Sequence, residues 1–285
     1  MFQLDEDKTV FMMPHELYCY KVMPFGLNNA GATYQRLMIK IFKPLIGQTM
    51  EVHINDIVVK NKTQSEHAQY LKETFRLMRA YNMKLNLAKC TFGISAGKFL
   101  GLMVTQWGIK VNPDKIKAIL ETPSPSSKKE LQRLTSRLAG LGHFIARFMD
   151  KLRPFFLTFK RESVTGWTNE CGQAFNEIKH YLTQRPVLSS PQSSEQLYMY
   201  LAVSNCAVNA ILFRHVSDKE QRIVYYVSKA MVDVETRYSK MEQMTLALKN
   251  AAQKLYPYFQ AHQVTVLANQ LLRSIWINQT CLGEC

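Results

Sequence analysis

The chain has 285 residues, 47% of them hydrophobic, so it can bury substantial cores and should divide into about two or more globular units. Its 36 Lys and Arg residues exceed its 22 Asp and Glu residues, and the resulting net charge of +14 favours a polyanionic partner such as nucleic acid. Many proteins carry solvated lysines without such a role, so the partner has to be argued from motifs.

Cysteine spacing and hydropathy exclude several protein classes. The six cysteines form no CxxC pair, and no histidines stand at zinc-finger spacing. The opening residues, MFQLDEDKTV, lack the basic and apolar regions of a signal peptide, and no run reaches the roughly 18 apolar residues of a membrane span. We therefore expect reduced thiols and an intracellular protein, cytoplasmic or nuclear, without a membrane segment.

The first hundred residues alternate between short strands and helices. Residues 50–60, MEVHINDIVVK, predict a strand, a polar turn and a second strand. Thr63 and Glu66 match a capping box at the start of a helix over residues 63–82. The apolar run 99–104 predicts one further strand.

The segment after residue 111 is predicted to be helical. Asn112 and Pro113 suit the cap and the first position of a helix that two following prolines end. Ser127 and Glu130 match a second capping box. Leucines spaced three and four residues apart mark the buried face of this second helix: Leu131, Leu134, Leu138 and Leu141.

A change of pattern near residue 190 predicts a domain boundary. Residues 185–196 are rich in Pro, Ser and Gln, as loops between domains are. Beyond them the sequence predicts three successive strands, a helix and a last strand, over residues 197–204, 207–214, 222–229, 238–255 and 263–269.

The block KVMPFGLNNAGATYQRLM, residues 21–38, resembles the reverse transcriptase of gypsy-type LTR retrotransposons. Further blocks resemble the same family in the same order, among them HINDIVVK, KLNLAKCTFG, ELQRLTSRLAGLGHFIARF and YYVSKAMVDVETRYSKMEQMTLAL. The resemblance covers nearly all of residues 1–276. Chance alone does not account for so many similar blocks in the same order.

The resemblance implies an α+β fold in four parts. It places partial reverse transcriptase fingers and palm at residues 1–110, a helical thumb at 111–150 and a connection at 151–194. A ribonuclease H-like domain with a five-stranded mixed sheet is expected at 195–285, truncated before its final helix.

For the polymerase centre, the resemblance implies three carboxylates that converge on two Mg²⁺ (or Mn²⁺) ions. One is expected upstream of Met1, and the adjacent pair falls on Asn55 and Asp56. Hard cations prefer anionic oxygen ligands, and only Asp56 supplies one here. We therefore expect impaired metal binding and an inactive polymerase centre. Without the resemblance, an Asn-Asp pair between strands would be read as an ordinary turn.

The resemblance also implies residues that touch nucleotide, template or phosphate. Gly26 permits close backbone approach, although a single glycine turn before a helix is weak evidence. Basic residues on a helix are ordinarily a solvated face, and in this context they can contact phosphates. The candidates are Phe25, Gly26, Gln35, Lys89, Arg133 and Arg137.

The ribonuclease H-like domain departs from its family in the same way. The acidic positions that converge on its metals fall on Asn205, Glu242 and Asn269, of which Glu242 alone is acidic. The metal candidates of the whole chain are thus Asp56 and Glu242. Glu242 also has a simple interpretation as an exposed helical glutamate.

Three aspartate positions that all hold asparagine suggest decay of a silenced element, because each change needs a single G to A transition. The leading hypothesis is a retrotransposon-derived polymerase and ribonuclease H fragment that has lost catalysis. The sequence leaves three alternatives open: a nucleic-acid-binding remnant, a product without a cellular role, and an active enzyme whose missing carboxylates come from a partner chain.

Overall fold

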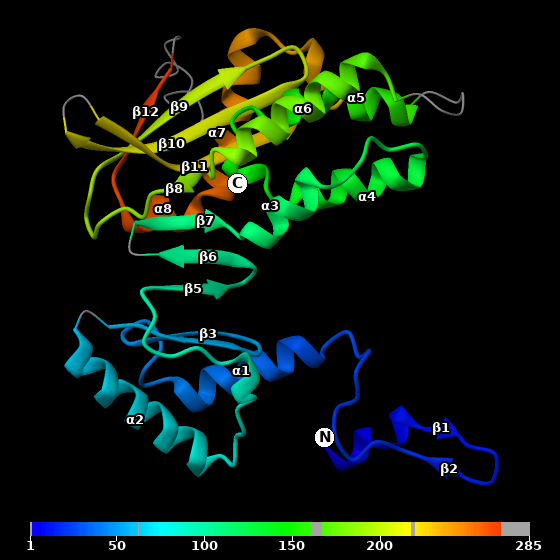
Figure 1. Cartoon of the computed structure of the whole chain (residues 1–285), viewed down its shortest axis with the longest axis vertical. Helices are drawn as coiled ribbons and strands as arrows, with labels where there is room; N and C mark the ends of the chain where they lie inside the picture. The colour runs from blue at the N-terminus through cyan, green and yellow to red at the C-terminus, as the bar shows by residue number, and fades with distance from the viewer. Residues whose placement is uncertain (1, 62, 106, 161–166, 218–219, 269–285) are drawn as a thin grey trace, which may run out of the picture. The chain divides into compact units, whose positions relative to one another are not determined.

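The computed structural model describes residues 2–61, 63–105, 107–160, 167–217 and 220–268. Helices and strands are mixed along the chain, as expected (Figure 1). The chain divides into two compact units, Met1–Ile94 and Ser95–Cys285. None of the helices in the described part of the chain has the length and apolar character that a bilayer crossing needs.

Two helices and two small hairpins make up the first unit. After the 3-10 turns η1 (Gln3–Asp5) and η2 (Asp7–Thr9), its elements are β1 (Phe11–Met12), β2 (Leu17–Tyr18), α1 (Ala30–Phe42), β3 (Met50–His53), β4 (Asp56–Val59), α2 (Gln64–Ala80) and η3 (Leu87–Lys89). The core lies between α1, α2 and the β3–β4 hairpin, and its fully buried side chains include Met38, Phe42 and Met50.

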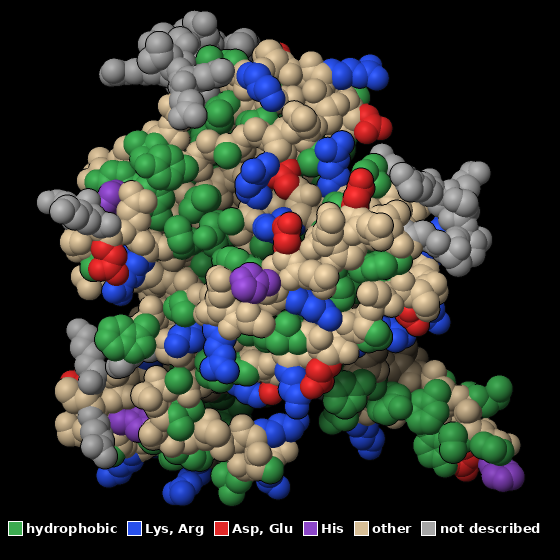
Figure 2. Space-filling model, turned by 45° about the horizontal axis from the view of Figure 1, so that its top comes forward, with side chains coloured by type: hydrophobic (Ala, Val, Ile, Leu, Met, Phe, Trp, Pro, Cys, Tyr) green, Lys and Arg blue, Asp and Glu red, His purple; other side chains and the backbone are tan. Residues whose placement is uncertain are grey.

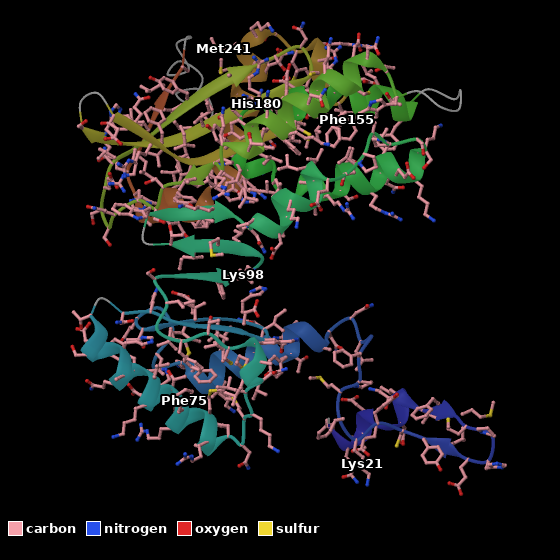
Figure 3. The ribbon with its side chains drawn as sticks, in the orientation of Figure 1. Lys21, Phe75, Lys98, Phe155, His180 and Met241 are labelled. Atoms are coloured by element: carbon pink, nitrogen blue, oxygen red, sulfur yellow. The ribbon has the colours of Figure 1, made fainter. Side chains whose placement is uncertain are left out.

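The second unit opens with an antiparallel sheet and a group of helices. The sheet has the order β5 (Ala96–Phe99), β6 (Leu102–Thr105), β7 (Gly108–Val111) and β8 (Val187–Leu188). The helices are α3 (Pro113–Leu120), α4 (Lys128–Ala139), η4 (Gly142–Phe144), α5 (Phe148–Lys160) and α6 (Asn169–Thr183). They share one core, in which Phe155 of α5 is fully buried (Figure 3).

The rest of the second unit is a mixed sheet with a helix on one face. Its strands have the order β11 (Glu220–Ala230), β10 (Ala207–Ser217), β9 (Leu197–Val203) and β12 (Val264–Leu267), and only β12 pairs in parallel. After η5 (Glu235–Arg237), α7 (Lys240–Lys254) packs on β9 and β10, and α8 (Tyr256–Ala261) leads into β12. The described residues thus form four strands of the five that the resemblance implied.

Several local predictions are confirmed. The β3–β4 hairpin, the Thr63–Glu66 capping box of α2 and the Asn112 cap of α3 all form. The leucine stripe of α4 is buried. At the second predicted box, the Ser127 side chain caps α4 as expected, and the Glu130 carboxylate also accepts from the backbone and hydroxyl of Ser126.

The predicted strand over residues 99–104 is wrong, because the run folds back on itself. Leu100 (φ 51°) and Gly101 (φ 73°) form a tight turn between β5 and β6. Two successive residues with positive φ match the twist of a short antiparallel hairpin. The segment 185–196, where composition predicts a boundary, contains β8, which pairs with β7.

Gly108 lets β7 and β8 approach closely, and its replacement tests this packing. Its φ is +135°, and an added Cβ would lie 2.0 Å from the carbonyl oxygen of Leu188. Gly108→Ala should therefore lower the free energy of unfolding by about 1–3 kcal/mol, measured by urea denaturation. Gly140→Ala is the control, because Gly140 has a helical φ of −64° and room for a methyl group. Equal effects of the two changes would contradict this packing.

Candidate active sites

The tip of the β3–β4 hairpin carries the predicted polymerase pair. His53 and Asp56 face each other across the antiparallel pair, so Ile54 and Asn55 form the turn between them. Ile54 has a φ of 49°, in the left-handed region that is unusual for a β-branched residue. Asn55 and Asp56 are both exposed. The structure therefore presents one carboxylate and one amide side by side at a tight, exposed turn.

Gln35 of α1 holds this turn through its side-chain amide. Its Nε2 donates to the carbonyl oxygen of Val52 at 3.1 Å, and its Oε1 accepts from the backbone N–H of Ile54. One amide thus satisfies backbone groups on the strand and in the turn. Sequence reasoning predicted a nucleotide or template contact for Gln35 and missed this scaffold contact, which joins residues 17 and 19 positions apart.

The other candidates of the first unit lie outside this contact. Phe25 is fully exposed ahead of α1, and Gly26 follows it with a φ of +100° and open space around it. Lys89 ends η3 and is exposed. These exposed positions leave the three residues accessible to a ligand, and the structure joins none of them to Asn55 and Asp56 by a described hydrogen bond.

Arg133 and Arg137 lie on the exposed face of α4, opposite its buried leucines. Arg137 Nη1 donates to Thr122 Oγ1 at 3.3 Å. The positive charge of Arg133 interacts with the Glu130 carboxylate one turn earlier on α4. Lys and Arg side chains, drawn in blue, are spread over the face of the molecule that Figure 2 shows. Both arginines are exposed and therefore accessible to a ligand from solvent.

In the ribonuclease H-like sheet, Asn205 is exposed in the turn between β9 and β10, and Glu242 stands in the first turn of α7. Glu242 is engaged in a capping box, since its carboxylate accepts from Ser239 N at 2.7 Å. This backbone hydrogen bond, with that of the Ser239 hydroxyl, lowers the pKa of Glu242. Its simple helical interpretation therefore has a definite structural basis. Asn269 lies outside the described residues.

The described residues do not fit a two-ion metal centre. Asp56 and Glu242 belong to different units, and no group of three or more His, Cys, Asp or Glu side chains within the described ranges is arranged to hold a metal ion. Asp56 has the neutral Asn55 beside it and His53 across the strand pair, and Glu242 already accepts a backbone hydrogen bond.

The Gln35 contact can be tested by truncation. Gln35→Ala leaves the N–H of Ile54 without its partner, so the free energy of unfolding should fall by about 1–3 kcal/mol. Gln48→Ala removes an exposed glutamine of the same unit and is expected to stay within about 0.5 kcal/mol. Chemical denaturation measures the free energy of unfolding of both variants. Equal values would rule out that Gln35 acts as a clamp on the β3–β4 hairpin.

Comparisons with known proteins bear on both units. Residues 2–104 match the family model described as reverse transcriptase (RNA-dependent DNA polymerase), and residues 167–266 match that of the RNase H-like domain found in reverse transcriptase. The chain is 30% identical over 271 residues to a retrovirus-related Pol polyprotein from transposon 297 of Drosophila melanogaster, covering 94% of the chain and 25% of that protein.

A second relative is the transposon Tf2-3 polyprotein of Schizosaccharomyces pombe, which is 29% identical over 86% of the chain and 18% of its own length. The chain thus spans a quarter or less of these two relatives. Foamy viral protease-reverse transcriptase in complex with dsDNA has a similar fold, with a TM-score of 0.80 at 20% identity over 100% of this chain and 62% of that one. The same viral protein in complex with an RNA/DNA hybrid gives a TM-score of 0.81 at 20% identity, over 92% and 36% of the two chains.

The two family matches, the homologous polyproteins and the shared fold agree with one another. Residues 2–104 therefore form a domain of the reverse transcriptase family, residues 167–266 form an RNase H-like domain of the kind found in reverse transcriptases, and the chain is homologous to a region of transposon Pol polyproteins.

Proposed function

We propose that this chain binds a nucleic-acid duplex and that its two ancestral catalytic centres are impaired. The observation that carries the proposal is the hairpin tip, where the neutral Asn55 stands beside the single carboxylate of Asp56. By lineage the activities are RNA-directed DNA synthesis and RNA cleavage in hybrids. In this proposal residues 111–150 act as the thumb and 151–194 as the connection.

Charge at the tip decides whether chemistry is feasible. Proteins of this family use divalent cations, Mg²⁺ or Mn²⁺ in our proposal, to neutralise charge that develops on phosphate oxygens. An amide oxygen is a neutral ligand, and it draws a strongly hydrated cation from water far less than a carboxylate does. Losing one anionic ligand costs several kcal/mol of transition-state stabilisation, and each 1.36 kcal/mol is a factor of ten in rate.

Duplex binding does not depend on these carboxylates. It depends on cationic side chains that neutralise phosphates, and the chain has a net charge of +14 with Arg133 and Arg137 exposed on α4. The viral protein of similar fold has been captured with dsDNA and with an RNA/DNA hybrid. An RNA/DNA hybrid is therefore the first ligand to test.

Restoring the charge at the tip tests the catalytic half of the proposal. The unmodified chain should give no extension of a primed RNA template with Mg²⁺ or Mn²⁺, because its tip lacks a second carboxylate. Asn55→Asp should tighten Mn²⁺ binding about tenfold, read by titration calorimetry. Asn82→Asp adds the same charge at an exposed turn elsewhere in the first unit and should not tighten it. Primer extension by the unmodified chain would overturn the proposal.

Neutralising the α4 face tests the binding half. Removing both charges in Arg133→Ala/Arg137→Ala should weaken binding of an RNA/DNA hybrid and reduce the slope of log K against log salt by up to about 1.8. Arg76→Ala/Arg79→Ala removes the same charge from exposed positions on α2. If both pairs weaken binding equally, the effect is one of net charge and α4 is not the contact surface.

A further inference from the structure

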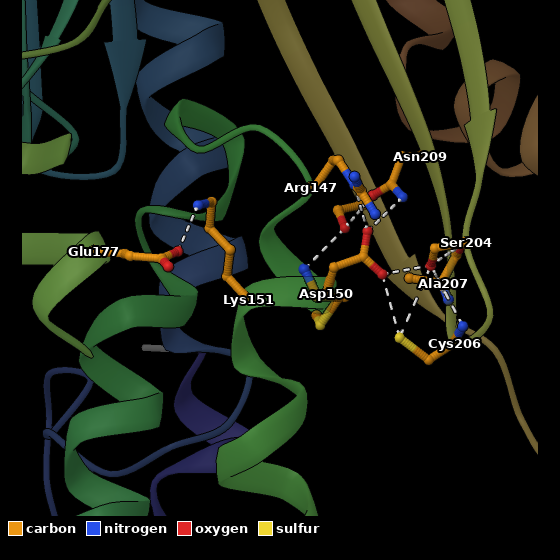
Figure 4. A network of polar contacts seen from close by, with 10 residues as sticks. Arg147, Asp150, Lys151, Glu177, Ser204, Cys206, Ala207 and Asn209 are labelled. Atoms are coloured by element: carbon orange, nitrogen blue, oxygen red, sulfur yellow. Dashed lines mark hydrogen bonds and ion pairs between the residues drawn. The ribbon is translucent and has the colours of Figure 1, made fainter. Parts of the chain in front are cut away.

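A partly buried carboxylate from outside the matched RNase H-like segment holds the turn that carries Asn205. Asp150 stands in the first turn of α5, whereas the family match begins at residue 167. Its side chain is only 14% exposed and points toward the β9–β10 turn (Figure 4). α5 thus contributes to a turn that lies more than fifty residues further along the chain.

Four donors converge on the two oxygens of Asp150. Oδ1 accepts from the hydroxyl of Ser204 and from Sγ of Cys206 at 3.2 Å. Oδ2 accepts from Nδ2 of Asn209 at 3.1 Å and from Nε of Arg147 at 2.9 Å. An ionised carboxylate only accepts hydrogen bonds, so Asp150 can pair with all four donors when it carries no proton.

The network continues into the next strand and closes on the helix. Asn209 is 3% exposed, and its Oδ1 accepts from Ser228 Oγ at 2.6 Å. Ser228 Oγ in turn accepts from the backbone N–H of Met149 at 2.9 Å. The polar groups of α5, β10 and β11 therefore satisfy one another, which is the condition for a buried polar cluster to stabilise a fold.

Hydrogen bonding keeps Asp150 ionised in spite of its burial. Burial raises the pKa of this carboxyl, but the hydrogen bonds from Ser204, Arg147 and Cys206 outweigh it and leave the pKa below its usual range. Burial raises the pKa of the Cys206 thiol, and the hydrogen bond to Asp150 raises it further. Cys206 is therefore a hydrogen-bond donor here rather than a reactive thiolate.

Ser204 passes the constraint on to the turn itself. Its Oγ donates to Asp150 and accepts from the backbone N–H groups of Cys206 at 3.3 Å and Ala207 at 3.0 Å. Asn205 lies between the two residues that Asp150 holds. With Oδ1 and Oδ2 each accepting two hydrogen bonds, Asp150 orients the turn and is not itself a free metal ligand.

We propose that Asp150 is the positioning residue of the RNase H-like centre: α5 supplies the carboxylate that fixes the Ser204–Cys206 turn, and with it position 205, on the sheet. The inference uses the family assignment of Asn205 but does not require that the centre is active. It also implies that the functional RNase H-like body includes α5, ahead of the matched segment.

Exchanging the two partners across the Asp150–Asn209 contact tests the proposal in the full chain. Asp150→Asn places an amide against the amide of Asn209 and the guanidinium of Arg147, so hydrogen exchange of the Cys206 and Ala207 amides should rise at least tenfold. Asn209→Asp should also raise it, because it sets two carboxylates side by side. The double variant, Asp150→Asn with Asn209→Asp, restores a donor opposite an acceptor. Its hydrogen-exchange rates at Cys206 and Ala207 should return to within about threefold of those of the unmodified chain.

The control and the readout separate positioning from general stability. Glu177→Gln breaks the Lys151–Glu177 ion pair (3.4 Å), which joins α5 to α6 and not to the β9–β10 turn, and should leave hydrogen exchange at Cys206 and Ala207 unchanged. Amides in the centre of β9 report global unfolding in every variant. The proposal would be overturned if Asp150→Asn left hydrogen exchange at the turn unchanged, or if the double variant were no better protected from hydrogen exchange than the single variants. Either result would count whatever the outcome of the primer-extension assay.

Discussion

Three segments that carry candidate catalytic residues are held by polar side chains whose partners lie in the backbone or in a neighbouring element. Gln35 spans the tip of the β3–β4 hairpin, Asp150 anchors the β9–β10 turn, and Ser239 and Glu242 cap α7. These hydrogen bonds pair backbone or side-chain groups at the three segments, so they fix the local backbone more strongly than turn propensity alone would. The scaffold around both centres is therefore well specified.

In this chain the backbone scaffold of the two candidate centres is present, but most of the negative charge that the family resemblance implies is missing. The hairpin, its clamp and the anchored turn are present, while Asn55 and Asn205 stand where the family resemblance places carboxylates. An asparagine side chain has nearly the same size and shape as an aspartate side chain, so the change leaves packing intact. It does remove the negative charge. The phosphate binding that we propose for α4 depends on cationic side chains instead, so it does not require the missing carboxylates.

Local sequence signals predicted those parts of the fold whose causes are local. The caps Thr63 and Asn112 and the leucine stripe of α4 act within one turn or one helix face, and all three form. The Leu100–Gly101 turn was missed because an apolar run hid it. Gln35 and Asp150 find partners 17 to 59 residues away, and no spacing rule within a single sequence marks such pairs. The candidate residues themselves came from the family resemblance, and their roles stay predictions.

The central claim is electrostatic: one carboxylate at residues 55 and 56 cannot hold a pair of catalytic cations. The most direct measurement is anomalous scattering from crystals of the unmodified chain grown with a primed RNA template, a nucleotide and Mn²⁺. The account predicts no pair of ions beside Asp56. Two manganese ions about 3.5–4 Å apart at that hairpin tip, the spacing of two-metal centres, would contradict it.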